Sequence, residues 1–469
     1  MVESISGSGR EASRQLLGVY VRVFLAYLFA VWLLWQVGLE SIEGHPTPFY
    51  ILVRPIAITG PVLLATGLQA ILIGCGLILF RGAMSGASEP SRRQVWRILA
   101  GLVVFAFCFS GAVALMRGGA TGISQAYARQ AYEYIGDIGN GGSIRGLFRD
   151  YNAIHPYLSM HAKVHPPGPI AMLWIMSFAV GREPLALSLA TMAIGATAVV
   201  PLYWWVRDMF DHATALTAGM LYVLMPSVVL FTATSADILF TPLTIAALFF
   251  FWRAIARRSA EYAIAAGAMY GLMSLTSFSL IGVGAFFGFT GLWKLRDPAT
   301  RAAVVKTALL MALSLVAVHG AVRWWSGFDV IECFRLAKQQ FELDQHHLDL
   351  YSPRWPSWTW KFLNPLSMAY FAGIPVTVMA LRAAMRPASG ARPLFLVIVL
   401  TLAALDILYL ARGEGERSAM YVLPFVAVLA AHGLENARRS AGSPAPAALT
   451  AAILALQCWF TEAVFYTYW

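Results

Sequence analysis

Long apolar runs recur along the whole chain and constrain its fold more than any other feature. One of them, 98–116, reads ILAGLVVFAFCFSGAVALM and contains no charged residue. A bilayer core of roughly 30 Å is crossed by a helix of about 20 apolar residues, and a helix satisfies its own backbone hydrogen bonds in lipid. We count about thirteen runs that meet or approach this length, which predicts an all-α polytopic membrane protein with about 13 transmembrane helices. The runs lie at roughly 17–38, 56–80, 98–116, 184–206, 213–231, 239–256, 261–277, 278–293, 302–322, 366–381, 393–411, 419–434 and 445–465.

The composition supports the membrane class and decides how the charge is interpreted. Hydrophobic residues make up 59% of the 469 residues and charged residues only 12%, against about 25% charged residues in soluble domains. The net charge of +10 would suggest a nucleic-acid partner in a soluble protein. Here the basic residues lie in alternate connections between apolar runs, which the positive-inside rule makes cytoplasmic. We therefore expect a cytoplasmic N-terminus, an external C-terminus and no nucleic-acid partner.

Five segments follow from this topology. Segment 1–116 combines a short polar cytoplasmic tail with the first three membrane spans, and 184–322 and 366–469 contain the remaining spans. Two long segments, 117–183 and 323–365, are predicted to lie outside the membrane. Long loops between closely connected spans usually carry function, so the active site is expected in the first of them. The second is rich in tryptophan, which is typical of the membrane interface and also stacks on sugar rings.

The first external segment is predicted to contain interfacial helices. Residues 124–135 place Tyr127, Ala131 and Tyr134 on one face of a helix. A glycine-rich turn, GDIGNGG, follows. The apolar run 169–181 is too short to span a bilayer, and it starts with a proline, which the first turn of a helix tolerates well. This run is therefore expected to form an interfacial or re-entrant helix.

The order of four motifs resembles a known family. YARQAYEYIGD and HPPGPIAMLW are followed by a span that ends in VRDMF and then by MPSVVLFTATSADILFTPLTIAALFFFWRA. This arrangement resembles the C-type integral-membrane glycosyltransferases, and most of all their branch of dolichyl-phosphate-mannose protein mannosyltransferases and lipid A aminoarabinose transferases. The resemblance covers mainly 117–256, with a weaker similarity at 412–424, RGEGERSAMYVLP.

The resemblance implies an enzyme of a bacterial plasma membrane, surrounded by membrane lipids. It would move a sugar from a polyprenyl-phosphate donor to a hydroxyl of a lipid or glycan acceptor on the external face. It would need no nucleotide or other cofactor, although some more distant C-type enzymes use a divalent metal. In such families a carboxylate of the first external loop acts as base or positions the acceptor, and basic residues hold the carrier phosphate.

Two positions depart from the pattern of this family. Relatives commonly carry an acidic pair where this chain has Ile123 and Ser124, so the usual first carboxylate is missing. They also carry a KPP sequence where this chain has His165 followed by two prolines, with Lys163 two residues earlier. A histidine can still donate to phosphate, more strongly when it is protonated.

Three aspartates are the predicted catalytic residues. Transfer from a lipid phosphate needs a carboxylate that takes the acceptor proton and cations that stabilise the departing phosphate. Asp137 or Asp150 would be the base, and Asp237, an ionisable residue near membrane depth, would orient the acceptor or the loop. Other roles stay open, with Asp137 as a turn residue and Asp237 as the cap of a helix at 238–256. Glu133 is a further acid candidate, but its place on the polar face of the amphipathic piece makes a solvated residue the preferred interpretation.

The predicted substrate-binding residues are mostly cations. An arginine fork matches two phosphate oxygens at once, and Arg417 stands at the external start of a span. Alternatively, Arg417 pairs only with its neighbours Glu414 and Glu416. The full predicted set is Lys163, His165, Arg412, Arg417, Arg145 and Tyr127.

Two histidine-containing clusters are the alternatives for a metal site. His155, His161 and His165 are close to Asp150 in the sequence, and DQHHLD spans 344–349. Neither cluster has a convincing ligand spacing, and no cysteine joins them. No metal ligand is therefore predicted.

Two other functions fit a chain of many spans. A transporter would be favoured by inverted repeats, and the two halves of this sequence have no internal similarity. A transferase that uses a phospholipid donor would need the same basic and acidic loop, so only substrate tests separate it from glycosyl transfer.

Overall fold

The computed structural model describes residues 2–36, 55–84, 89–130, 132–351, 357–388, 390–408 and 415–465. The elements of these ranges are α-helices and short 3-10 helices, which confirms the predicted all-α class. The α-helices of the first half are α1 (Val2–Gln36), α2 (Gly60–Met84), α3 (Arg92–Ala114), α4 (Ala120–Ala128), α5 (Ile144–Ile154), α6 (Met160–Lys163), α7 (Gly168–Val180), α8 (Pro184–Ala196), α9 (Val199–Met209), α10 (His212–Leu224) and α11 (Pro226–Thr234).

The second half contributes as many helices. They are α12 (Phe240–Arg257), α13 (Ala260–Ser274), α14 (Gly284–Lys294), α15 (Pro298–Ser326), α16 (Val330–Tyr351), α17 (Trp360–Phe371), α18 (Ile374–Met385), α19 (Arg392–Leu408), α20 (Gly415–Ser418), α21 (Leu423–Ala441) and α22 (Ala445–Val464). The 3-10 helices are η1 (Tyr134–Asp137), η2 (His155–Tyr157), η3 (Ala236–Leu239), η4 (Phe278–Val283), η5 (Ser357–Thr359) and η6 (Met420–Val422).

The described helices confirm a polytopic membrane protein but not the number of spans. Seven helical segments are long and apolar enough to cross a membrane, or nine if each of two bent pairs is one span. Other apolar runs form shorter helices, such as α7 with 13 residues and α19 with 17. The count of about thirteen is therefore not confirmed. The polar tail expected before the first span is itself helical, since α1 begins at Val2.

Two of the runs expected to span the membrane are broken in the middle. The chain bends by 52° between α10 and α11 and by 113° between α17 and α18. Met225 has an extended backbone because the residue before a proline avoids helical angles. At the second break, Gly373 has a φ of 100°, which favours glycine, and a Cβ there would collide with Leu454.

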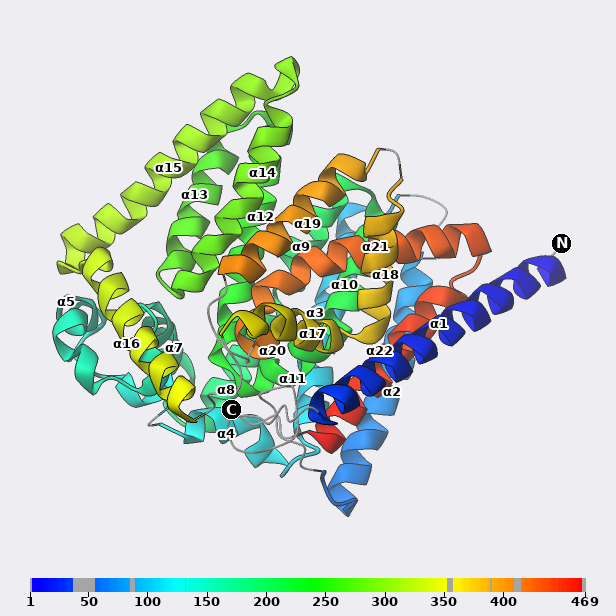
Figure 1. The fold of residues 1–469 in the computed structure, drawn as a ribbon, viewed down its shortest axis with the longest axis horizontal. Coiled ribbons are helices and arrows are strands. Elements are labelled where there is room, and N and C mark those ends of the chain that lie inside the picture. Colours follow the sequence, from blue (N-terminus) through cyan, green and yellow to red (C-terminus); the bar gives the residue numbers. More distant parts are fainter. Residues whose placement is uncertain are drawn as a thin grey trace.

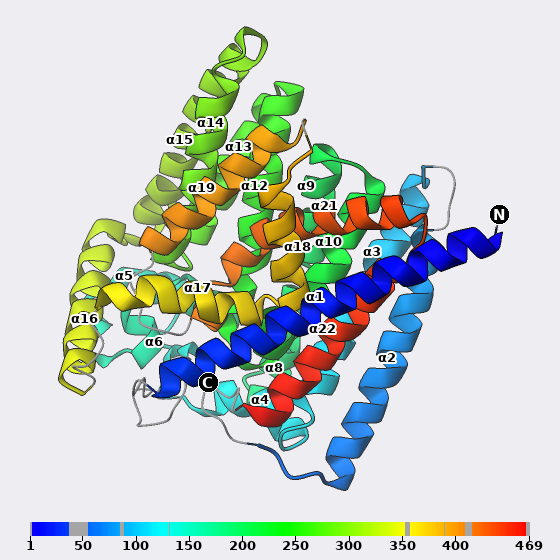
Figure 2. The same ribbon diagram turned by 45° about the vertical axis from the view of Figure 1, so that its right-hand side comes forward.

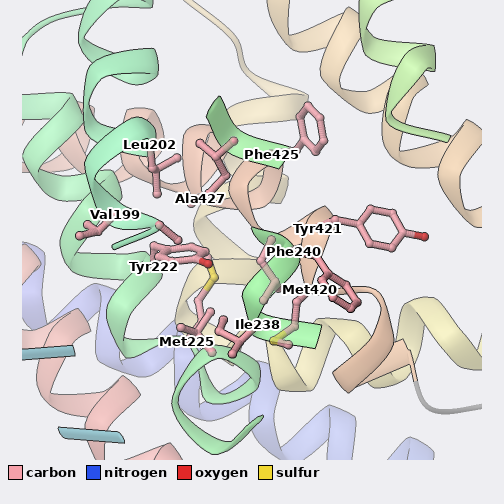
Figure 3. Close-up of a cluster of buried hydrophobic side chains, with 14 of the residues drawn as sticks. Val199, Leu202, Tyr222, Met225, Ile238, Phe240, Met420, Tyr421, Phe425 and Ala427 are labelled. Atoms are coloured by element: carbon pink, nitrogen blue, oxygen red, sulfur yellow. The ribbon is translucent and has the colours of Figure 1, made fainter. Parts of the chain in front are cut away.

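Helices that are distant in sequence pack side by side. At one end of the molecule, α13 lies between α12 and α15, and at the other α1 crosses α22 and α18 (Figures 1 and 2). A buried cluster between α9, α10, α12 and α21 includes Leu202, Tyr222, Phe240 and Phe425 (Figure 3). This core fixes the ends of α12 and α21 on which the candidate site depends.

The two segments predicted to be external contact each other. α16 packs against α5 and α6, on the left of Figure 1. Asn152 Nδ2 donates a hydrogen bond of 2.9 Å to the Asp329 carbonyl, and the Phe148 ring lies edge-on to the Phe328 ring with centroids 5.6 Å apart. The first and second external segments therefore form one structural unit beside the bundle.

The helix expected over 124–135 is much shorter. α4 ends at Ala128, and the chain resumes as η1 at Tyr134. Gly136 packs so closely on the Gln130 carbonyl that a Cβ would collide with it, so the backbone folds back there. Tyr127 and Tyr134 thus do not share one helical face, and the third residue of that predicted face, Ala131, lies outside the described residues.

Candidate active site

A large cavity lies where the first external segment meets α12, α16, α19 and α20. Its volume is about 810 Å³. The charged and histidine residues of its lining are Glu133, His161, His165, Asp237, Lys338 and Arg417. Most of the remaining lining is apolar and includes Phe240, Leu280, Ile281, Phe334, Phe341, Leu405, Leu408 and Met420. The cavity therefore joins a small polar region to a long apolar wall.

Glu133 supplies a carboxylate that is shielded from bulk water and still lines the cavity. Only 1% of the residue is exposed. His161 Nδ1 lies 3.1 Å from Glu133 Oε1, and within the described ranges no hydrogen bond of good geometry reaches that oxygen. The interpretation of Glu133 as a solvated surface residue is wrong, because α4 stops before it and the following turn directs it inward. This oxygen is able to accept a hydrogen bond from a ligand hydroxyl.

Asp237 on η3 and Arg417 on α20 lie next to each other in the cavity lining. Arg417 Nε lies 3.8 Å from Asp237 Oδ2, and the two side chains are 5% and 14% exposed. Ser235 Oγ donates a hydrogen bond of 2.8 Å to Asp237 Oδ2 and accepts one from the Asp237 backbone N–H. Asp237 does not cap the long helix, since α12 begins only at Phe240. The alternative in which Arg417 pairs only with its loop neighbours is likewise excluded by this contact.

His165 contributes a neutral imidazole to the same region. Its ring packs edge-on to Tyr134 and against Phe240, with centroids 5.8 and 6.4 Å apart. Burial lowers the pKa of His165 to about 4, although the Asp237 carboxylate opposes this shift. The ring is therefore uncharged at neutral pH. Its Nδ1 lies 3.4 Å from the Thr276 carbonyl oxygen, which can only accept, so Nδ1 carries the proton and Nε2 is left as a hydrogen-bond acceptor for a ligand hydroxyl.

A close backbone contact holds the HPPGP stretch in place. The Gly168 N–H donates a hydrogen bond of 2.9 Å to the Leu275 carbonyl at the end of α13. A Cβ on Gly168 would collide with that carbonyl, so only glycine fits here. Pro169 lies in the first turn of α7, where its missing N–H costs no hydrogen bond. The proline-rich segment thus directs His165 toward the cavity, and α7 is a helix where one was predicted.

The two loop aspartates do not line the cavity. Asp137 accepts hydrogen bonds of 3.0 Å from the Ser159 N–H and from Asn140 Nδ2, and burial raises its pKa. These contacts fit its alternative role as a turn residue. Asp150 forms an ion pair of 2.8 Å with Arg149 at the surface, and this contact lowers the pKa of Asp150. Of the three predicted catalytic aspartates, only Asp237 lies in the cavity.

Three of the other predicted substrate-binding residues, Lys163, Arg145 and Tyr127, do not line the cavity. Lys163 lies near Asp137, and its charge partly opposes the rise that burial causes in the Asp137 pKa. Arg145 is exposed on α5. Tyr127 is buried, with its hydroxyl 2.8 Å from Thr191 Oγ1. Arg412 lies outside the described residues.

Several lining residues come from segments that the sequence analysis did not assign. On α16, Phe334, Lys338 and Phe341 follow the spacing of one helical face, which is a signal that periodicity could have revealed. Ser277 and Ser279, whose hydroxyls are 2.9 Å apart, lie on either side of the junction between the apolar runs 261–277 and 278–293. These polar groups became assignable only once the fold placed α13, η4 and α16 around one space.

The described residues contain no group of three or more His, Cys, Asp or Glu side chains arranged to hold a metal ion. His161 and His165 line the cavity, while His155 Nε2 is 2.8 Å from the Lys163 carbonyl oxygen. The second predicted cluster is only partly described, because the side chains of His347 and Asp349 lie outside the described set. Whether the protein uses a metal or another cofactor stays a prediction.

One comparison with known proteins, the family model, supports the resemblance found in the sequence. Residues 164–324 match the model of the dolichyl-phosphate-mannose-protein mannosyltransferase family. The search of curated proteins found no match. Among solved structures, the chain is similar to an oligosaccharyltransferase from Archaeoglobus fulgidus, with a TM-score of 0.46 and 15% identity over 68% of this chain and 48% of that one. This chain thus spans about half the length of that protein.

The family match bears out the resemblance over residues 164–324. The matched segment includes His165 and Asp237. Glu133 and Arg417 lie outside it, so their assignment to the site depends on the cavity alone.

Proposed function

We propose that this chain moves a sugar from a polyprenyl-phosphate donor to an acceptor hydroxyl on the external face of a bacterial plasma membrane. The observation that carries the proposal is one cavity in which two carboxylates, a buried arginine and a neutral histidine meet a long apolar wall. A water-soluble donor such as a nucleotide sugar has no apolar chain that could bind this wall. A lipid-linked donor uses both parts of the cavity.

The apolar and polar parts of the donor bind the apolar and polar parts of the cavity, respectively. Its isoprenoid chain lies against the apolar residues of η4, α16 and α19, among them Leu280, Phe341 and Leu408. Its phosphate meets Arg417, whose guanidinium presents parallel N–H donors. The neutral His165 ring accepts a hydrogen bond from a hydroxyl of the donor sugar. Binding of the isoprenoid chain removes this apolar surface from water, which favours a lipid-linked donor over a water-soluble one.

The reaction is a single inverting displacement. The acceptor oxygen attacks the anomeric carbon, the bond from that carbon to the phosphate oxygen breaks, and polyprenyl phosphate leaves with both electrons. Glu133 takes the proton of the acceptor hydroxyl, and His161 beside it holds the carboxylate in position. Arg417 stabilises the charge that develops on the leaving phosphate.

Asp237 orients the arginine in this mechanism. Because Ser235 fixes the Asp237 carboxylate, the carboxylate in turn fixes the direction of Arg417. Glu133 is proposed as the base in place of Asp137 or Asp150, because neither aspartate lines the cavity. Lys163, Arg145 and Arg412 stay predictions as outer contacts of the donor or acceptor.

Donor binding tests this proposal. Short-chain polyprenyl-phosphate sugars are titrated into the purified protein in detergent, with wild type compared with Arg417→Gln. Loss of one charged contact to phosphate is expected to weaken binding by about tenfold to a hundredfold. The matched control is Arg301→Gln, an exposed arginine at the start of α15 that does not line the cavity, which is expected to bind like wild type. Absence of binding to every donor in the wild type would contradict the proposal and favour a transporter or a phospholipid-dependent transferase.

A further inference from the structure

A second cavity lies on the other side of the molecule, between α2, α3, α10 and α22. Its volume is about 220 Å³, and it shares no lining residue with the candidate active site. Its inner wall is formed by buried residues of α10 and α22, namely Leu216, Met220, Val223, Leu224 and Ala451. Its sides are formed by α2 and α3, which lie against each other.

The lining of this cavity is apolar except at one end. Arg97 on α3 is the only charged residue among the described residues that line it. Arg81 in the last turn of α2, with Arg92 and Arg93 in the first turn of α3, adds charge near the same end of the helix pair. All four arginines are exposed. The cavity is therefore an apolar slot with positively charged side chains at one end.

The surroundings of the slot are those of a bilayer. α2 is a candidate membrane span with a mean hydropathy of 2.3 over its most apolar window, and only 17% of that window is buried in the protein. The residues of α2 that face outward, such as Ile71 and Ile78 with 65% and 72% exposed, would face hydrocarbon. An occupant from water is disfavoured there, whereas an acyl chain is already present at high concentration.

We infer that this slot binds one phospholipid with an anionic headgroup. One acyl chain lies in the groove between α2 and α3, and the headgroup phosphate meets Arg97 and the neighbouring arginines. Charge complementarity selects the anionic lipid over a zwitterionic one, since each basic residue near the surface attracts acidic lipid. The inference does not depend on glycosyl transfer, because the slot and the candidate active site have no residue in common.

A glycine in the slot allows the acyl chain to be displaced without disturbing the helix packing. Gly101 lines the cavity, and a Cβ built on it meets no atom within 4 Å. Gly101→Leu therefore fills the groove and also removes a residue with poor helix propensity. Gly74 on the neighbouring helix offers the control, because its Cβ position is equally open and it does not line the cavity.

The test uses the whole protein in nanodiscs that contain equal amounts of phosphatidylglycerol and phosphatidylcholine, and native mass spectrometry counts the lipids retained after the disc is removed. Wild type and Gly74→Leu are expected to retain one phosphatidylglycerol. Gly101→Leu is expected to lower that retention by about tenfold, and Arg97→Gln by about fivefold. Arg301→Gln, an exposed arginine at the start of α15, is expected to retain the lipid as wild type does.

Three results would overturn the inference. They are equal retention of phosphatidylglycerol and phosphatidylcholine by the wild type, unchanged retention in Gly101→Leu, and a wild-type dimer that Gly101→Leu converts to monomer. The last result would mean that the groove receives a second copy of the chain instead of a lipid.

Discussion

The charged residues of the candidate site work in pairs whose members are brought together by the fold. Glu133 contacts His161, and Asp237 contacts Arg417. Asp237 and Arg417 could be predicted from the sequence, because ionisable residues at the edge of an apolar run are costly and usually have a function. The sequence offers Glu133 only as a weaker candidate, since the amphipathic pattern around it continues past the point where the helix ends and indicates a solvated face.

The buried His165 makes stability depend on pH. Its pKa is lowered to about 4 by burial, whereas in the unfolded chain it is about 6.5. Between these values the unfolded state binds more protons, so stability is present above pH 6.5 and is lost as the pH falls toward 4. Thermal denaturation in detergent is expected to show a smaller loss over this range for His165→Gln than for wild type. The two proteins are expected to have parallel profiles above pH 7, and parallel profiles over the whole range would contradict the shift.

At the level of elements, the apolar runs predict where the helices lie, but they do not predict where a run is broken into two helices. The runs around 98–116 and 302–322 became single long helices. The run at 366–381 bends by 113° between α17 and α18 because a glycine with positive φ lies against Leu454. This contact joins residues that are distant in the sequence, so a hydropathy profile cannot predict it.

The junction of α7 with α13 is the element contact on which the site most depends. Gly168→Ala would drive a methyl group into the Leu275 carbonyl and displace the proline-rich segment. Overpacking of this kind is expected to destabilise the protein by about 1–3 kcal/mol and to weaken donor binding as well. Denaturation and donor titration on the same preparation measure both effects.

Gly288→Ala serves as the control for this substitution. Gly288 lies on α14, and its Cβ position has no neighbour within 4 Å. The alanine is expected to be neutral or to stabilise the helix by up to about 1 kcal/mol. Equal effects of the two substitutions would mean that the α7–α13 contact does not support the site.

At the scale of the whole molecule, charge distribution predicts the orientation in the membrane. The basic connections should be cytoplasmic and the candidate active site external. Single cysteines at Arg145 on α5 and at Arg301 on α15 provide two exposed sites that should lie on opposite sides. A membrane-impermeant thiol reagent added to intact cells is expected to label only Arg145→Cys. Labelling of Arg301→Cys alone would reverse the topology and place the cavity on the cytoplasmic side.

The central claim is that a carboxylate in the cavity is the base for sugar transfer from a lipid phosphate. The most direct measurement is release of polyprenyl phosphate in the presence of acceptor, by wild type, Glu133→Gln and Asp137→Asn, with donor binding measured in parallel. Glu133→Gln is expected to bind donor normally and to lose about 10²–10⁴-fold in rate, as for removal of a general base. Asp137→Asn is expected to keep most of the rate at reduced stability. Normal turnover in Glu133→Gln, with loss of turnover in an equally folded Asp137→Asn, would contradict the account and return the base to the loop aspartate.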